Sequence, residues 1–85
     1  MSRIRVYTSS YCGYCSAAKH LLTSRGYEFE EINMQGDPKL MQEIMRKSGQ
    51  RTVPQIFIGE HSLGGYRELL SAATSGELER LVADA

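Results

Sequence analysis

Two kinds of hydrophobic pattern alternate in the first third of the chain. Residues 3–8, RIRVYT, place apolar side chains between arginines, with the period of two that is typical of a β-strand. Residues 27–34, YEFEEINM, alternate similarly until the phase shifts at Ile32. Between them, an apolar stripe at helical spacing ends before Gly26 and consists of Ala17, Ala18, Leu21 and Leu22. The pattern predicts a strand, a helix and a second strand, the two strands being parallel and joined by a right-handed crossover.

The second half of the chain predicts a helix, a hairpin and two short helices. Asp37 and Pro38 are the cap and first residue of a predicted helix that continues to the stop signal at Gly49. Residues 56–63 begin with a continuous apolar run and pass through a glycine turn, which predicts a β-hairpin. Helical spacing then returns on both sides of Gly76, with Leu69, Leu70 and Ala73 before it and Leu78, Leu81 and Val82 after it.

Composition limits the size of the fold and the kinds of partner. A chain of 85 residues is expected to form one small domain, residues 1–85, with a single core. Ten basic and ten acidic residues give a net charge of zero, which argues against a nucleic-acid-binding surface. No apolar run approaches the roughly 18 residues of a membrane span, and the N-terminus lacks a signal peptide's apolar segment. We therefore expect a cytoplasmic monomer without nucleic-acid or membrane partners.

The two cysteines, Cys12 and Cys15, lie between the first predicted strand and helix. A disulfide across so short a loop constrains little of the unfolded chain, and a reducing cytoplasm disfavours structural disulfides. A structural zinc site normally takes four protein ligands, and His20 and His61 lie outside the usual finger spacing. Haem attachment needs a histidine directly after the second cysteine, where Ser16 stands. A redox-active cysteine pair is the interpretation that remains.

Three segments in this order resemble the small bacterial-type glutaredoxins over essentially the whole chain. They are CGYC at residues 12–15, RTVPQIFIG at residues 51–59 and LGG at residues 63–65. The resemblance implies an α/β, thioredoxin-like fold with a four-stranded mixed sheet flanked by helices. It also implies an enzyme that reduces glutathione mixed disulfides and protein disulfides, with glutathione as the electron donor.

The predicted position of the cysteines gives them different roles. A thiolate at a helix N-terminus is stabilised by free backbone N–H groups and by the helix dipole, and Cys12 is expected to occupy that position. Cys15 lies one turn deeper and is expected to be more buried. Cys12 is therefore the predicted nucleophile, and Cys15 is predicted to attack the mixed disulfide at Cys12 and release the substrate.

The resemblance further implies a glutathione-binding site beside Cys12. The Val53–Pro54 bond is expected to be cis, with the backbone of Val53 turned toward a peptide-like ligand. Arg51 is expected to approach the glycyl carboxylate, and amides at the start of the third helix the γ-glutamyl carboxylate. The expected glutathione-binding residues are Tyr14, Arg51, Thr52, Val53, Pro54, Gly64, Gly65, Tyr66 and Arg67.

The sequence departs from the common glutaredoxin pattern at three places. Gly13 replaces the usual proline between the cysteines, and some relatives without that proline hold a two-iron cluster between two subunits. Tyr66 and Arg67 stand where a small thiol and an acid are usual, so Arg67 either binds the γ-glutamyl carboxylate or is a solvated helix charge. The usual lysine before the nucleophile is absent. Two alternatives stay open: a dimer that holds a 2Fe–2S cluster through Cys12, and a redoxin reduced by a thioredoxin-type reductase.

Overall fold

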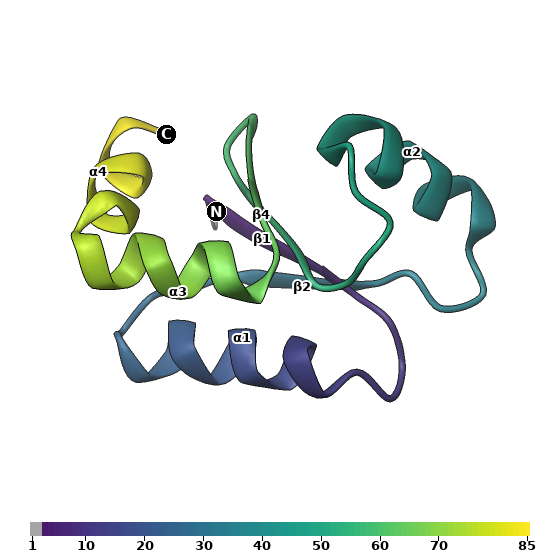
Figure 1. Cartoon of the computed structure of the whole chain (residues 1–85), viewed down its shortest axis with the longest axis horizontal. Helices are drawn as coiled ribbons and strands as arrows, with labels where there is room; N and C mark the ends of the chain where they lie inside the picture. The colour runs from purple at the N-terminus through teal and green to yellow at the C-terminus, as the bar shows by residue number, and fades with distance from the viewer. Residues whose placement is uncertain (1–2) are drawn as a thin grey trace.

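Four strands form one mixed sheet, as the resemblance implies. A computed structural model describes residues 3–85 (Figure 1), so Met1 and Ser2 of the expected domain lie outside the described residues. The strand order across the sheet is 2-1-3-4; the first two strands are parallel, and the other neighbours are antiparallel. The strands are β1 (Ile4–Thr8), β2 (Glu30–Asn33), β3 (Gln55–Ile58) and β4 (His61–Gly64).

The helices begin and end where the capping residues of the sequence predict. They are α1 (Gly13–Ser24), α2 (Pro38–Ser48), α3 (Tyr66–Ser75) and α4 (Glu77–Asp84). At the start of α2, the Asp37 carboxylate accepts a hydrogen bond of 3.1 Å from the Leu40 N–H. Gly49 ends the same helix with a left-handed φ of 73°, which a residue without a Cβ adopts at little cost. Gly76 has a φ of 87° and separates α3 from α4.

Both faces of the sheet are buried. Because successive residues of a strand point to opposite faces, the two central strands contribute to two separate clusters. One cluster lies between the sheet and helices α1, α3 and α4 (Figure 1), and its buried members are Ile4, Val6, Ala18, Leu22, Ile56, Ile58, Leu69, Ala72 and Leu78. The other lies on the α2 side and consists of Tyr7, Met34, Ile44 and Phe57. The sheet thus divides the expected single core into two.

Strand β2 is shorter than the alternating pattern of residues 27–34 predicts. The chain is still bonded to α1 at Tyr27, whose N–H donates to the Leu22 carbonyl at 3.0 Å, so the strand begins only at Glu30. Phe29 packs against the cluster on the side of α1, α3 and α4, whereas Ile32 packs against the cluster on the α2 side. The shift in hydrophobic phase therefore marks a segment that packs one partly buried side chain against each cluster.

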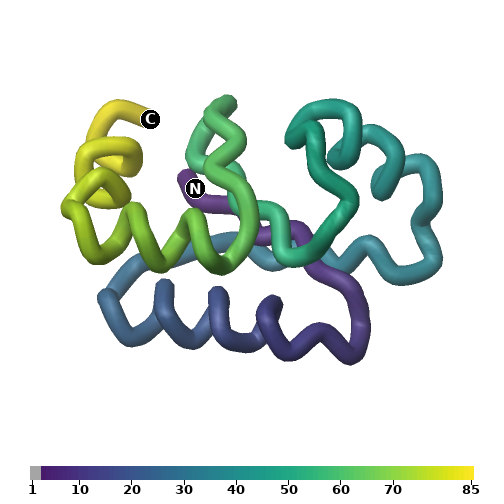
Figure 2. Tube along the Cα trace, viewed as in Figure 1, coloured from purple at the N-terminus to yellow at the C-terminus, as the bar shows by residue number. Residues whose placement is uncertain are grey.

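The fold places the cysteines at the turn from β1 into α1. This turn lies beside the segment that leads into β3 (Figure 2), where Cys12 Sγ is 3.7 Å from the Val53 carbonyl oxygen. The other end of β1 lies near the end of α4, because Arg3 Nη1 donates to the Val82 carbonyl at 2.8 Å.

Within the described part of the chain, no helix has both the length and the apolar character needed to cross a membrane.

Candidate active site

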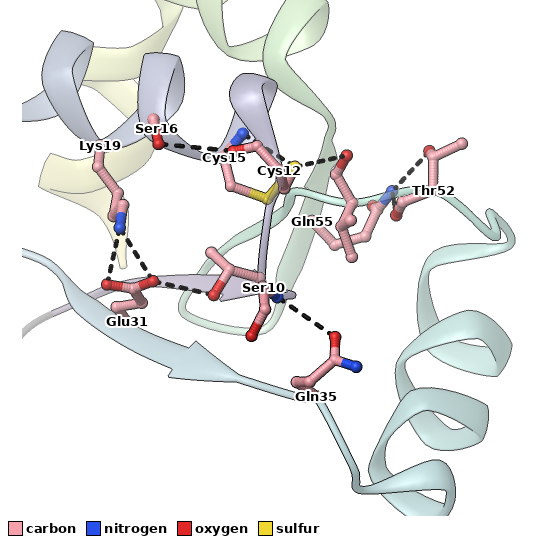
Figure 3. The surroundings of a disulfide bond; sticks show 11 residues. Ser10, Cys12, Cys15, Ser16, Lys19, Glu31, Gln35, Thr52 and Gln55 are labelled. Atoms are coloured by element: carbon pink, nitrogen blue, oxygen red, sulfur yellow. Dashed lines mark hydrogen bonds and ion pairs between the residues drawn. A yellow bond between two sulfur atoms is a disulfide. The ribbon is translucent and has the colours of Figure 1, made fainter.

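The cysteine pair occupies the first turn of α1, as predicted. Cys12 is the N-cap residue, with an extended backbone (φ −109°, ψ 109°), and its Sγ accepts a hydrogen bond of 3.1 Å from the Cys15 N–H. Cys12 and Cys15 form a disulfide (Figure 3). Cys15 is only 2% exposed, whereas Cys12 is half-buried. The sulfur that an external disulfide can reach is therefore that of Cys12.

The local backbone favours an anionic sulfur at this position. Amides of the first helical turn have no partner inside the helix, and one of them, the Cys15 N–H, points at Cys12 Sγ. The first turn of α1 carries no acidic side chain that would oppose a thiolate. Tyr11 turns the chain into the helix with a left-handed φ of 61°, which costs about 1–2 kcal/mol for a residue with a side chain. No pattern in the sequence predicts this conformation, and the Tyr11 ring is fully exposed.

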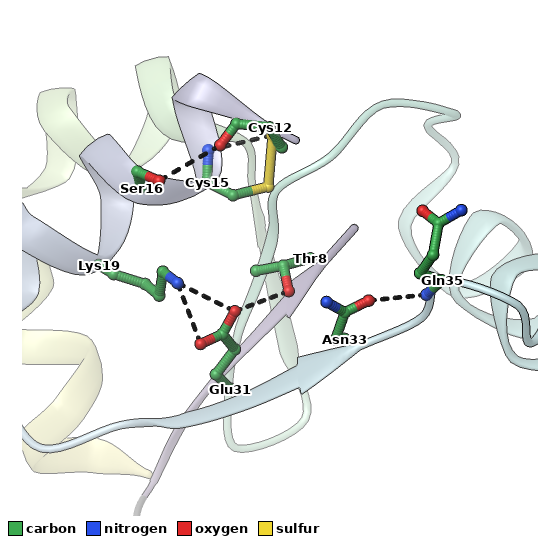
Figure 4. Close-up of polar contacts among 8 residues, drawn as sticks. All are labelled: Thr8, Cys12, Cys15, Ser16, Lys19, Glu31, Asn33 and Gln35. Carbon is green, nitrogen blue, oxygen red and sulfur yellow. Dashed lines mark hydrogen bonds and ion pairs between the residues drawn. A yellow bond between two sulfur atoms is a disulfide. The ribbon is translucent and has the colours of Figure 1, made fainter. Parts of the chain in front are cut away.

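An ion pair joins α1 to β2 beneath the cysteines (Figure 4). Lys19 Nζ lies 3.1 Å from both carboxylate oxygens of Glu31, which also accepts a bond of 2.9 Å from the hydroxyl of buried Thr8. Burial raises the pKa of Glu31, but the hydrogen bonds from Lys19 and Thr8, together with the lysine charge, hold it below its usual range. The nearest lysine after the cysteines is thus already engaged with a carboxylate.

An open groove of about 640 Å³ runs beside the cysteine pair. Its lining residues are Tyr14, Gln50, Arg51, Thr52, Val53, Pro54, Gly65, Tyr66, Arg67 and Glu68. All the expected glutathione-binding residues except Gly64 line this groove, and Gln50 and Glu68 are additions that the motifs did not indicate. The Val53–Pro54 peptide bond is cis, as the resemblance implies. Val53 lies where the groove meets the cysteine pair, because its carbonyl oxygen is next to Cys12 Sγ.

Gly64 lies outside the groove and has a structural reason to be glycine. Its φ is 122°, and a Cβ at this position would lie 2.6 Å from the carboxylate of Glu68. That carboxylate accepts a hydrogen bond of 2.8 Å from the Gly65 N–H. The Gly65 amide, expected to receive a ligand carboxylate, is therefore already paired. In the described chain, the amides left without a partner at the start of α3 are those of Tyr66, Arg67 and Glu68.

The groove combines two arginines with an aromatic wall. Arg51 and Arg67 are both exposed, and within residues 3–85 neither forms an ion pair. Tyr14 and Tyr66 pack with their ring centroids 6.0 Å apart and an interplanar angle of 31°. Glu68 supplies the one acidic side chain of the lining. The surface therefore suits a small ligand that carries more negative than positive charge and presents an apolar stem.

A metal site is not completed by the residues of one chain. Among residues 3–85, no group of three or more histidine, cysteine, aspartate or glutamate side chains is arranged to hold a metal ion. Cys12, the ligand suggested for a 2Fe–2S cluster, has Cys15 as its sulfur partner. These residues alone do not fit an iron–sulfur cluster.

Comparisons with known proteins agree with this arrangement. The protein-family model described as Glutaredoxin matches residues 4–63. A glutaredoxin from Pseudomonas aeruginosa is 43% identical over 82 residues, which are 96% of this chain and 98% of that protein. Glutaredoxin 3 from Escherichia coli K12 is 38% identical over 82 residues, which are 96% of this chain and 99% of that protein.

Solved structures of such proteins superpose closely on this chain. The crystal structure of a buckwheat glutaredoxin–glutathione complex has a TM-score of 0.87 at 29% identity, and the match covers 96% of this chain and 77% of that one. The solution structure of a glutaredoxin from Brucella melitensis has a TM-score of 0.84 at 40% identity, and the match covers 96% of this chain and 89% of that one.

Proposed function

This chain belongs to the glutaredoxin family of thiol–disulfide oxidoreductases, and from that premise we propose that it uses glutathione as its electron donor. One observation carries the proposal: the accessible sulfur of Cys12 adjoins Val53, which lines a groove whose exposed cations are Arg51 and Arg67. The likeness to a buckwheat glutaredoxin that was crystallised with glutathione supports it.

The proposed reaction begins at the Cys12 thiolate. Its Sγ attacks the glutathione sulfur of a mixed disulfide, so that a new S–S bond forms at Cys12 while the bond to the substrate protein breaks. The substrate leaves as a thiolate and takes a proton from water. The Cys15 N–H, 3.1 Å from Cys12 Sγ, stabilises the sulfur whenever it is anionic, before the attack and after its release.

Glutathione completes the cycle. The thiolate of a second glutathione attacks the glutathione sulfur bound to Cys12, which releases glutathione disulfide and restores the Cys12 thiolate. With a protein disulfide, Cys12 first forms a mixed disulfide with the substrate, and Cys15 then attacks Cys12 Sγ and releases the reduced substrate. The resulting Cys12–Cys15 disulfide is the state of the present structure, and two glutathione molecules return its two electrons.

The charges of glutathione match the groups that line the groove. In the proposed pose, Arg51 pairs with the glycyl carboxylate, and the backbone of Val53 pairs with the cysteinyl part of the ligand. The γ-glutamyl carboxylate lies at the start of α3, where the Tyr66 and Arg67 amides and the Arg67 guanidinium are available. Glu68 gives the γ-glutamyl ammonium a partner of opposite charge. Gly65 contributes close approach of the backbone rather than its amide, which Glu68 already occupies.

This chemistry suits a compartment in which glutathione is kept largely reduced. We therefore propose that the protein acts in the cytoplasm on glutathionylated and disulfide-containing proteins. We propose separately that it acts as a monomer, because the proposed cycle uses the two cysteines and the groove of one chain.

A turnover assay with defined reductants tests the proposal. A glutathionylated peptide is supplied either with glutathione, glutathione reductase and NADPH, or with a thioredoxin-type reductase and NADPH. We expect sustained NADPH oxidation only in the first mixture, and none with Cys12→Ser. Turnover that depends on the thioredoxin-type reductase and not on glutathione would instead support the redoxin alternative and reject the proposal.

A further inference from the structure

We propose that the buried Gln55 is a positioning residue that holds the groove segment, residues 50–53, in the shape that binds glutathione. The inference rests on the proposed function, since this segment matters to catalysis only if it contacts the ligand. Gln55 is the first residue of β3 and is only 1% exposed. Its side chain is therefore out of reach of any substrate, and its influence must pass through its neighbours.

The Gln55 amide bonds to two residues of the groove segment, Gln50 and Thr52. Its Nε2 lies 2.9 Å from the Thr52 carbonyl oxygen and 3.4 Å from Thr52 Oγ1 (Figure 3). The same Nε2 lies 2.9 Å from Gln50 Oε1. An amide nitrogen carries two hydrogens, which the two shorter contacts use. The Thr52 carbonyl can only accept, so it fixes which side of the Gln55 amide faces the segment.

The two anchored residues adjoin the parts of the groove that are assigned to the ligand. Arg51 lies between Gln50 and Thr52, and the next residue is Val53, whose carbonyl oxygen is 3.7 Å from Cys12 Sγ. One buried side chain in the sheet thus sets the position of the cation proposed for the glycyl carboxylate and of the backbone proposed for the cysteinyl part. The Gln55 amide is the link between the rigid sheet and the exposed segment.

Stability alone gives a weak reason for glutamine at this position. Gln55 Oε1 is buried and forms no hydrogen bond within residues 3–85, and an unpaired buried acceptor opposes folding. Gln50 and Thr52 are exposed, so water can replace Gln55 as their partner when the chain is folded. An apolar side chain of similar volume should therefore preserve the fold while releasing the groove segment. Such a substitution is expected to weaken substrate binding without lowering stability.

The test compares Gln55→Met with Gln42→Met, which changes an exposed glutamine of α2 outside the groove. For the full chain, KM and kcat are measured with a glutathionylated peptide, along with Tm and the amide hydrogen exchange of residues 50–53. For Gln55→Met we expect KM to rise about tenfold with kcat changed less than about twofold. Tm should not fall, and exchange in the groove segment should be faster. Gln42→Met should match wild type in every readout.

Each outcome separates this inference from the proposed function. If wild type does not use glutathione, the proposed function fails, and the inference that depends on it fails as well. If wild type is active and Gln55→Met changes neither KM nor the exchange of residues 50–53, the positioning role alone is overturned. Should Gln55→Met not fold, Gln55→Glu replaces it, because it sets an oxygen against the Thr52 carbonyl and should raise KM likewise. Loss of folding in both variants, or a lower Tm with unchanged KM, would make Gln55 purely structural and overturn the proposal.

Discussion

The thiol site and the groove beside it are built in different ways. The thiol site is local, because Cys12, Cys15 and the amide that stabilises the sulfur all belong to the first turn of α1. The groove is assembled from three distant parts of the chain, residues 14, 50–54 and 65–68. The reactivity of Cys12 should therefore depend mainly on α1. Selectivity for glutathione should depend on how residues 50–54 and the start of α3 pack against α1.

The largest expected effect is that of Cys12→Ser. A hydroxyl cannot form the thiolate nucleophile at neutral pH, so turnover of every disulfide substrate should be abolished. Cys15→Ser makes the same atomic change one turn deeper and is the matched control. It should still reduce glutathione mixed disulfides, because a second glutathione resolves the Cys12 adduct, but lose much activity on protein disulfides. Steady-state assays with both substrate classes measure this, and equal losses on the glutathionylated substrate would contradict the assignment.

Removing a ligand-binding side chain from the groove should leave the reactivity of Cys12 unchanged. Arg51→Ala removes a cation assigned to the glycyl carboxylate, so it should raise KM for a glutathionylated peptide by the equivalent of about 1–3 kcal/mol. The alkylation rate of Cys12 by iodoacetamide should stay the same, because the helix terminus is unchanged. Arg67→Ala, tested beside it, shows whether the second arginine binds the ligand or is a solvated helix charge. An equal slowing of alkylation and turnover would mean that the two regions are not separable.

Gly13→Pro should stabilise the thiol site without touching the groove. Gly13 is the first residue of α1, where proline fits well, and a Cβ there would meet nothing within 4 Å. The preceding Cys12 is already extended, the conformation that a following proline favours. We expect a gain of up to about 1 kcal/mol, seen as a Tm increase of about 4–8 °C. A lower Tm would show that the first turn of α1 needs a conformation that proline forbids.

The smallest expected effect concerns the ion pair beneath the cysteines. The pKa of Glu31 is lowered in the folded chain from about 4.5, so its ionised form adds stability above that pH and loses it as the pH falls through the folded value. Because the pair is about one-third exposed, Glu31→Gln should cost only about 0.5 kcal/mol at pH 7. Urea unfolding at pH 7 and pH 3 measures the difference, which should shrink at the lower pH. Glu30→Gln, an exposed neighbour, should show no such change.

The sequence predicted features that depend on neighbouring residues better than features that depend on contact across the fold. Asp37 and Gly49 mark α2 because a cap acts within one turn of its helix. Cys12 at the start of α1 follows the same logic. The strand boundary at Glu30 was missed because it depends on the Tyr27 N–H still being bonded to α1. Local propensity carries no information about such a bond.

Within the groove, too, residues in local motifs were predicted and residues that act through contacts across the fold were missed. Its motif residues were found through resemblance, but Glu68 was missed because its bond to the Gly65 amide requires the geometry of the turn into α3. Gln55 was missed because a glutamine inside a predicted strand gives no sign that it will bond to Gln50 and Thr52. Lys19 and Glu31 are 12 residues apart and meet only when β2 pairs with β1 beneath α1. Side-chain contacts of this kind depend on three-dimensional packing rather than on spacing.

In the proposed reaction, Cys12 takes glutathione, and not the substrate protein, from a mixed disulfide. The most direct test mixes reduced Cys15→Ser with one equivalent of a glutathionylated peptide and identifies the adduct by peptide mass spectrometry. We expect glutathione attached to Cys12 and the peptide released as a free thiol. The peptide attached to Cys12 with glutathione released would contradict the groove as a glutathione site, and the absence of any adduct at Cys12 would contradict the nucleophile itself.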